Sequence, residues 1–102
     1  MRISFAAPAV SDLEAIRSWY AGQQAPEVGE RLLREIFAHL ERLADFPESG
    51  RLAPELAGRG VRELVYGAYR VFYRIEQESV LILTVRHASQ LIREDEVAEG
   101  RT

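Results

Sequence analysis

The chain has 102 residues, 47% of them hydrophobic and 28% charged, which suits one domain with one hydrophobic core. All 13 basic residues are arginine, and 16 carboxylates give a formal net charge of −3. The lack of cysteine excludes disulfides, thiolate metal sites and thiol nucleophiles, and the lack of lysine excludes Schiff bases and a phosphate-loop lysine. The first residues have too short an apolar run for a signal peptide, and no run approaches the roughly 20 apolar residues of a spanning helix. A soluble cytoplasmic protein is therefore expected.

The N-terminal half predicts a strand followed by two helices. Residues 2–6 alternate polar and apolar side chains, as a half-buried strand does, and Pro8 suits the first turn of a helix. Residues 22–25 break this helix, and Pro26 opens a second helix that runs for about five turns to Phe46. Because the connection is short, the two helices should form an antiparallel hairpin.

The C-terminal half predicts a loop and then a meander. Residues 47–60 are rich in proline and glycine, so a loop with one short turn at 54–56 is expected. Three runs of strand-like sequence follow with short connections, which implies antiparallel pairing: Val61–Tyr66, Tyr69–Glu76 and Val80–His87. The expected fold is α+β, a single domain over 1–102 with its core at about 2–88 and an acidic tail at 89–102. The first strand should pair beside the three-stranded meander.

Alternation along the predicted strands divides the sheet into two faces. The face toward the helix hairpin should carry Val71, Tyr73, Ile75, Leu81, Leu83 and Val85. The opposite face should carry Arg70, Phe72, Arg74, Val80, Ile82, Thr84 and Arg86. In residues 61–66 either alternate set fits the inner face, and Arg62 is assigned outward because a buried unpaired guanidinium is costly. An open face rich in apolar and arginine side chains indicates a surface for a partner or a polyanion. The alternative is that the tail or the 47–60 loop covers it.

Several ordered motifs resemble the ParE/RelE superfamily of toxins from bacterial type II toxin–antitoxin systems, and its ParE branch more closely. The match spans about residues 2–88. It rests on Ala9-x-x-Asp12-Leu13-x-x-Ile16-x-x-Tyr20, Leu43-x-x-Phe46-Pro47-x-x-Gly50-Arg51, Val61-Arg62-Glu63-Leu64, Tyr69-Arg70-Val71-Phe72-Tyr73-Arg74-Ile75 and Ile82-Leu83-x-Val85-x-His87. The resemblance implies the same order of a strand, a helix hairpin and a three-stranded meander.

The resemblance also implies that the protein arrests growth unless a cognate antitoxin, encoded beside it, binds it. ParE-branch members are associated with inhibition of DNA gyrase, whereas RelE-branch members cut messenger RNA on the ribosome, so the fold alone does not choose between them. A non-toxic binding module that has kept the fold is a further alternative.

RNA cleavage needs a general base, a general acid and cations for the phosphate, for which the candidates are Arg62, Arg86 and His87. RelE-like nucleases are strongly basic, commonly with lysines and with an aromatic residue near the end of the last strand. This chain has no lysine, Ala88 follows His87, and a net charge of −3 opposes RNA binding. A gyrase poison that acts by binding, without being an enzyme and without cofactor or metal, is therefore the preferred interpretation. His87 then becomes a hydrogen-bonded residue at the rim of the core.

The predicted partner contacts lie mostly on the open sheet face. They are Arg62, Arg70, Phe72, Arg74, Ile82 and Arg86, with Trp19 as a possible aromatic anchor on the first helix. The expected partners are a ParD-like antitoxin, in a hetero-oligomer, and DNA gyrase as the target. Neither a membrane nor sequence-specific nucleic-acid binding is expected.

Overall fold

The structure is a computed structural model, and it describes residues 1–90 and 92, apart from the side chain of Ala57. The predicted acidic tail therefore falls almost entirely outside the described residues. The elements are β1 (Arg2–Phe5), α1 (Ala7–Gly22), α2 (Pro26–Glu41), η1 (Arg42–Ala44), β2 (Arg51–Leu52), η2 (Pro54–Arg59), β3 (Val61–Tyr66), β4 (Tyr69–Ile75) and β5 (Ser79–His87). The predicted α+β order is confirmed. The short strand β2 was not predicted, and η2 is longer than the expected turn.

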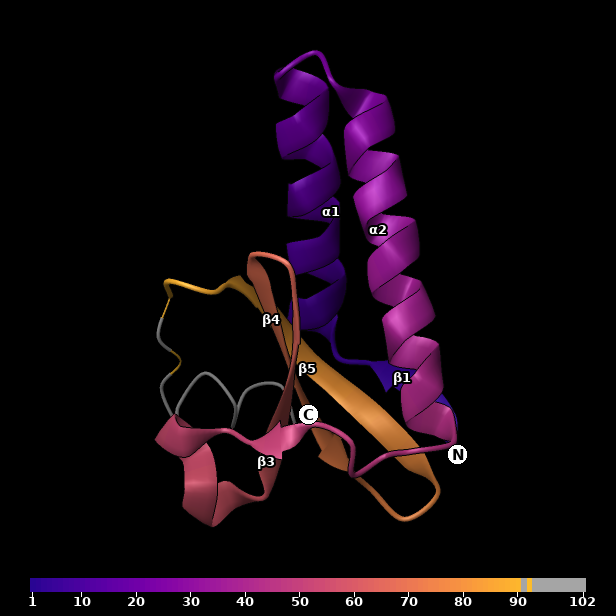
Figure 1. Cartoon of the computed structure of the whole chain (residues 1–102), viewed down its shortest axis with the longest axis vertical. Helices are drawn as coiled ribbons and strands as arrows, with labels where there is room; N and C mark the ends of the chain where they lie inside the picture. Colours follow the sequence, from indigo (N-terminus) through magenta and orange to yellow (C-terminus); the bar gives the residue numbers. More distant parts are fainter. Residues whose placement is uncertain (91, 93–102) are drawn as a thin grey trace.

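The two helices form the expected antiparallel hairpin, which stands on one face of the sheet with its tip beyond the sheet (Figure 1). Proline lies in the first turn of each helix, where a missing N–H costs no hydrogen bond. The α-helical part of α2 ends at Glu41, earlier than the predicted Phe46, and the chain continues as the 3₁₀ turn η1.

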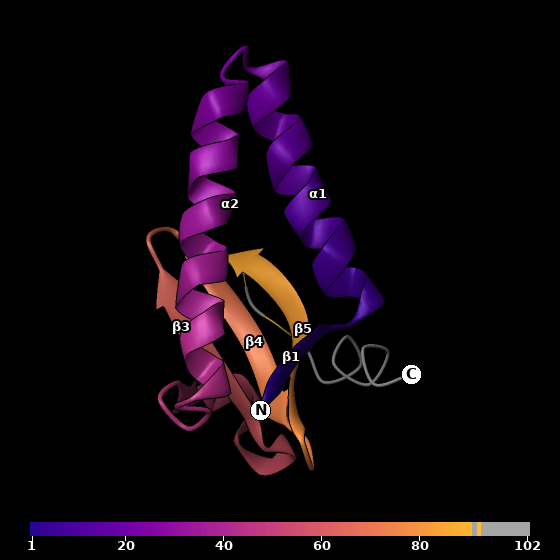
Figure 2. The ribbon, with the colours of Figure 1, turned by 90° about the vertical axis from the view of Figure 1, so that its right-hand side faces the viewer.

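The sheet has five strands in the order β1-β5-β4-β3-β2. The β1–β5 pairing is parallel and the other pairings are antiparallel. Gly67, with φ of 57°, lies in the two-residue turn between β3 and β4, where a positive φ favours glycine. The prediction that the first strand pairs beside the meander is confirmed, and Figure 2 shows β1 next to β5 below the hairpin.

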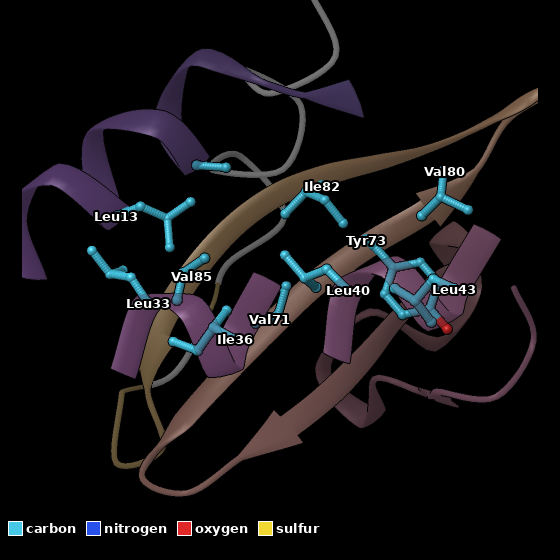
Figure 3. Packing of buried hydrophobic residues seen from close by; sticks show 11 residues of the cluster. Leu13, Leu33, Ile36, Leu40, Leu43, Val71, Tyr73, Val80, Ile82 and Val85 are labelled. Carbon is cyan, nitrogen blue, oxygen red and sulfur yellow. The ribbon is translucent and has the colours of Figure 1, made fainter. Parts of the chain in front are cut away.

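The main hydrophobic core lies between the sheet and the hairpin (Figure 3). Its buried members come from both helices, η1, β4 and β5: Ala9, Leu13, Leu33, Ile36, Leu40, Leu43, Val71, Tyr73, Val80, Ile82 and Val85. Ile75 packs against this cluster, so the helix-facing predictions are confirmed for Val71, Tyr73, Ile75 and Val85.

A β-bulge in β5 makes the predicted faces wrong for part of that strand. Phe72 pairs with Thr84, but the next residue, Tyr73, pairs with Ile82, which leaves Leu83 as an extra residue. The extra residue shifts the alternation N-terminal to it. As a result Val80 and Ile82 face the helices, whereas Leu81 and Leu83 face the other way.

The sheet face turned away from the helices, here called the outer face, is covered. A second core of buried residues lies on it, formed by Ala53, Leu56, Val61, Phe72, Leu83 and Ile92. Residues 53–59, here called the strap, contribute Ala53 and Leu56 to this core, and Ile92 adds a further apolar side chain. The expected open face is therefore wrong, and the alternative that the 47–60 loop covers it is correct. Phe72 is fully buried under the strap, and Ile82 is fully buried on the opposite side.

Candidate functional site

Arg70 lies at the centre of an ion network between the outer face and the strap. Its Nε donates to Oε1 of Glu63 at 2.6 Å, and its terminal nitrogens donate to both carboxylate oxygens of Glu55 at 2.9 Å. The buried Glu63 carboxylate also accepts a hydrogen bond from Arg51. The guanidinium carbon of Arg70 lies 4.6 Å from the centroid of the Phe72 ring. Because bidentate arginine–carboxylate pairing is strong and directional, this network ties the strap to the sheet.

The network also shifts the pKa values of Glu55 and Arg70. The hydrogen bonds from Arg70 hold the pKa of Glu55 below its ordinary value. Hydrogen bonds to Glu55, and then to Glu63, raise the pKa of Arg70. Arg70 is only 9% exposed, so its predicted place on an open face is wrong. Its positive charge is already balanced by two carboxylates.

Arg62 lies on the helix-facing side of β3, opposite Tyr73, and its expected outward position is wrong. Its Nη1 donates to the carbonyl oxygens of Gly50 at 2.7 Å and Glu48 at 3.3 Å. The Tyr73 hydroxyl donates to the carbonyl of Pro47 at 2.7 Å in the same loop. These carbonyl acceptors replace water around the guanidinium, which removes the penalty that the outward assignment assumed.

Arg74 lies on the outer face, opposite Val61 and Leu81. Its Nε donates to Glu76 at 3.1 Å, and its side chain is 17% exposed. It therefore reaches solvent at the edge of the covered region, but only in part.

A cleft lies between α1 and the part of the sheet where β4 begins and β5 ends. It brings together three of the predicted functional residues, Trp19, Arg86 and His87. Its polar and aromatic lining includes Trp19, Tyr20, Tyr69, Arg86, His87 and Gln90. Trp19 is 59% exposed, with its ring edge-to-face with that of Tyr20 at 4.9 Å. The rings of Tyr69 and His87 meet in the same geometry at 5.9 Å. Arg86 donates through Nε to the Thr84 hydroxyl at 3.2 Å.

His87 is exposed and its ring orientation is fixed by the residues that follow it. Its Nδ1 lies 2.9 Å from the hydroxyl oxygen of Ser89 and 3.3 Å from the backbone nitrogen of the same residue. The backbone N–H of His87 donates to Oε1 of Gln90 at 2.9 Å.

The three candidate nuclease residues do not share one site. Arg86 and His87 both line the cleft, but Arg62 lies two strands away, on the other side of β4. Arg62 is opposite Tyr73 and His87 is opposite Tyr69, which places them four positions apart along β4. At about 3.3 Å per residue this is roughly 13 Å along the strand, before the two strand spacings are added.

Asp12 stands in one of the family motifs, and the structure shows it to be a positioning residue, a role that the sequence did not predict. Its Oδ2 accepts hydrogen bonds from the Thr84 hydroxyl and from the backbone N–H of Val85 at 2.9 Å. It thereby fixes α1 to β5 at the base of the cleft. The sequence contains the donor and the acceptor, but only the tertiary fold shows that α1 passes this end of β5. The role of Glu63 was missed for a similar reason, since the path of the loop brings its partner Arg51 beside it.

Within the described part of the chain, no group of three histidine or acidic side chains is arranged to hold a metal ion. None of the described helices combines the length and the apolar character needed to cross a membrane.

Comparisons with known proteins identify the family. The family model described as the ParE toxin of the type II toxin–antitoxin system parDE matches residues 3–92. The toxin RelE2 of Caulobacter vibrioides is 37% identical over 84 residues, which covers 81% of this chain and 90% of that toxin.

Two solved structures have similar folds. The chromosomal ParDE system from P. aeruginosa aligns with a TM-score of 0.73 at 22% identity, over 87% of this chain and 97% of that chain. The toxin–antitoxin complex RelBE2 from Mycobacterium tuberculosis aligns with a TM-score of 0.54 at 29% identity, over 84% and 95% respectively. The chain thus belongs to the ParE/RelE superfamily, as a member of the ParE toxin family of type II toxin–antitoxin systems.

Proposed function

We propose that this toxin arrests growth by binding DNA gyrase, without catalysing a reaction of its own, and that a ParD-like antitoxin neutralises it. The observation that carries this proposal is that the three candidates for RNA cleavage do not form one site. Arg62 is bound by loop carbonyls and lies two strands away from Arg86 and His87. An acidic chain also lacks the excess positive charge that normally dominates affinity for RNA.

The cleft is the proposed contact surface for gyrase. It presents an exposed tryptophan, Trp19, beside Arg86 and His87, and tryptophan and arginine are the residue types that most often dominate binding energy. Of the predicted partner contacts, Trp19 and Arg86 are retained here. Phe72 and Ile82 are fully buried and offer no surface in this conformation.

Purified toxin should inhibit supercoiling by gyrase or accumulate cleaved DNA, and the antitoxin should reverse the effect. Trp19→Ala should weaken inhibition about tenfold or more, as expected for an interface hot spot. Phe46→Ala is the matched control, because Phe46 is 65% exposed but lies outside the cleft. Gyrase that is unaffected by micromolar toxin would rule out this target.

Ribosome-dependent cleavage of messenger RNA is the second candidate function. It is favoured by the name of the relative RelE2 and by the adjacent positions of Arg86 and His87 in the cleft. It predicts cleaved messenger RNA in a cell-free translation mixture, with loss of cleavage in His87→Ala. Intact messenger RNA at toxin concentrations that stop growth would reject it.

Expression of the toxin without its antitoxin separates both functions from a non-toxic binding module. Either toxic activity predicts growth arrest that co-expression of the antitoxin relieves. Normal growth with soluble, folded protein present would favour the binding module.

A further inference from the structure

The last part of β5 extends beyond the end of β1, and side chains bind its main chain there. β1 pairs with β5 only as far as Ile82, so Val85 and His87 lie past this pairing. The N–H of Val85 donates to Oδ2 of Asp12 at 2.9 Å, and that of His87 donates to Oε1 of Gln90 at 2.9 Å. Main-chain groups alternate in direction along a strand, so these two N–H groups point toward the same edge. The two side chains supply the acceptors that a neighbouring strand would otherwise provide.

Gln90 binds His87 at two points. Besides accepting through its side chain, it donates its own N–H to the carbonyl of His87 at 2.9 Å. The N–H of Ala88 donates to the carbonyl of Ala68 at 2.6 Å, which holds the same turn against the connection between β3 and β4. Arg86, His87 and Gln90 all line the cleft. The turn after β5 therefore sets where this wall of the cleft lies.

Arg70 binds the same turn from the outer face. Its Nη1, which donates to Glu55, also donates to the carbonyl of Gln90 at 3.3 Å. Arg70 itself lies outside the lining of the cleft. Two residues after Gln90, Ile92 is buried in the second core with only 3% of its surface exposed. The chain thus passes from the cleft to the covered face within three residues, and Gln90 is bonded in both directions.

We propose that Gln90 is a positioning residue of the cleft, and that Arg70 acts on the cleft through it. This inference rests on the proposed function in taking the cleft as the surface that binds gyrase. The hydrogen bonds run without a break from Glu55 of the strap through Arg70 and Gln90 to the main chain of His87. A continuous network of this kind can transmit a change at one end to the other. The contacts that close the strap therefore also hold the His87 wall of the cleft in place.

Amide exchange at His87 tests the role of Gln90. Gln90→Leu removes the acceptor at similar size, so the amide of His87 should exchange about threefold faster or more. The amide of Val85 is the internal reference, because Asp12 remains its acceptor. Gln90→Glu keeps an oxygen acceptor and should keep the protection of His87. Unchanged exchange at His87 in Gln90→Leu would overturn the proposal.

The same amide tests whether Arg70 acts through Gln90. Arg70→Met should also speed exchange at His87 by about threefold or more, because the carbonyl of Gln90 loses a donor. Gly50→Ala is the control for lost stability, since its new Cβ crowds Tyr73 and Glu63 but leaves the turn intact. It should not change exchange at His87, which occurs by local opening at the end of the strand. Equal rates in Arg70→Met and Gly50→Ala would overturn the action of Arg70 on the cleft.

Arg70→Lys is the second variant in case Arg70→Met does not fold. It keeps a cation for the two carboxylates, but one nitrogen replaces the Nε and Nη1 that reach Glu63 and Gln90 separately. It should speed exchange at His87 in the same way, and an unchanged rate would contradict the proposal.

Inhibition of gyrase supercoiling tests the consequence for binding. Gln90→Leu and Arg70→Met should each weaken inhibition about threefold or more at a temperature where both variants are folded. The double variant should be no weaker than Gln90→Leu alone, because both changes act through one contact. Gly50→Ala should inhibit as the unmodified toxin does. Additive effects of the two substitutions would overturn the proposal.

Two outcomes separate this proposal from the proposed function. If the unmodified toxin does not inhibit gyrase, the proposed function fails, and exchange at His87 still decides whether Gln90 and Arg70 position the cleft. If the unmodified toxin inhibits gyrase and neither substitution weakens inhibition, the gyrase target stands and this proposal fails.

Discussion

Arg70 is surrounded by Glu63 of β3 and Glu55 of the strap, and the three side chains form one unit with the Phe72 ring. The unit joins the strap to the sheet through charge-assisted hydrogen bonds, and the second core fills the space beneath it. A substitution at Arg70 should therefore lower the stability of the fold, whether or not Arg70 contacts a partner.

Arg70→Met should lower the free energy of unfolding by about 3–5 kcal/mol, because it leaves Glu55 without its bidentate partner and the buried Glu63 with Arg51 alone. Arg74→Met is the matched control. Its pair with Glu76 reaches solvent, and such pairs contribute less than about 1 kcal/mol. Urea denaturation of both variants measures the difference, and equal losses would contradict the structural role of Arg70.

Glu55 should make the stability depend on pH. Its pKa in the folded chain lies below the ordinary value, so its contribution is complete above the ordinary carboxylate pKa and is lost as the pH falls through the lowered value. Glu55→Gln should therefore be less stable than the unmodified chain at pH 7, with a smaller difference near pH 3. Denaturation at the two pH values measures this, and a constant difference would argue against the ion pair.

Among the elements, the strands and helices were predictable because their signals are local. Proline, glycine and apolar periodicity mark the helix hairpin, and the bounds of β3 are those that alternation predicts. The β-bulge at Leu83 was not predictable from alternation, since both faces of β5 carry apolar residues and the extra residue has no local mark. The sequence thus predicted Ile82 on the wrong face, although its strand was correct.

The site was less predictable than the fold because its partners come from distant elements. The sequence pointed to Trp19, Arg86 and His87, and the cleft does bring them together. It also grouped Arg62 and Arg70 with them. Their acceptors are loop carbonyls and the carboxylates of Glu55 and Glu63, and the path of the loop determines these contacts.

The loop after η1 depends on a close approach at Gly50. Its N–H donates to the hydroxyl of Tyr73 at 2.9 Å, and a Cβ there would lie 2.5 Å from that oxygen and 2.6 Å from the carbonyl oxygen of Glu63. Gly50→Ala should therefore destabilise the chain by about 1–3 kcal/mol through overpacking.

The matched control for the loop is Gly58→Ala in η2, where an added Cβ meets nothing within 4 Å. This change should be neutral or should stabilise by less than about 1 kcal/mol, because it restricts the unfolded chain. Thermal unfolding compares the two variants. A stable Gly50→Ala variant would show that the loop can move away from Tyr73 without loss.

At the scale of the whole molecule, the sheet is covered on both faces while the tip of the helix hairpin extends beyond it (Figures 1 and 2). The buried helix residues Leu33, Ile36 and Leu40 belong to the sheet-side core, whereas residues 21–28 at the tip are exposed or half-buried. The hairpin should therefore open locally at its tip without global unfolding.

Hydrogen exchange should detect this opening. Amides of residues 19–22 should exchange at least about tenfold faster than those of residues 36–40, because their opening exposes little of the core. Equal protection along the hairpin would show that the helices open only with the whole molecule.

Trp19 is the only tryptophan of the chain, and it lies half in solvent at the cleft, across α1 from the free edge of β1. Its indole emission therefore reports on one surface alone. A ligand that covers the cleft should shift the emission to shorter wavelength, whereas a ligand bound on the other side of α1 should leave the spectrum in place. One fluorescence titration, with no label added, can thus tell whether the target and the antitoxin occupy the toxin at the same time or displace each other.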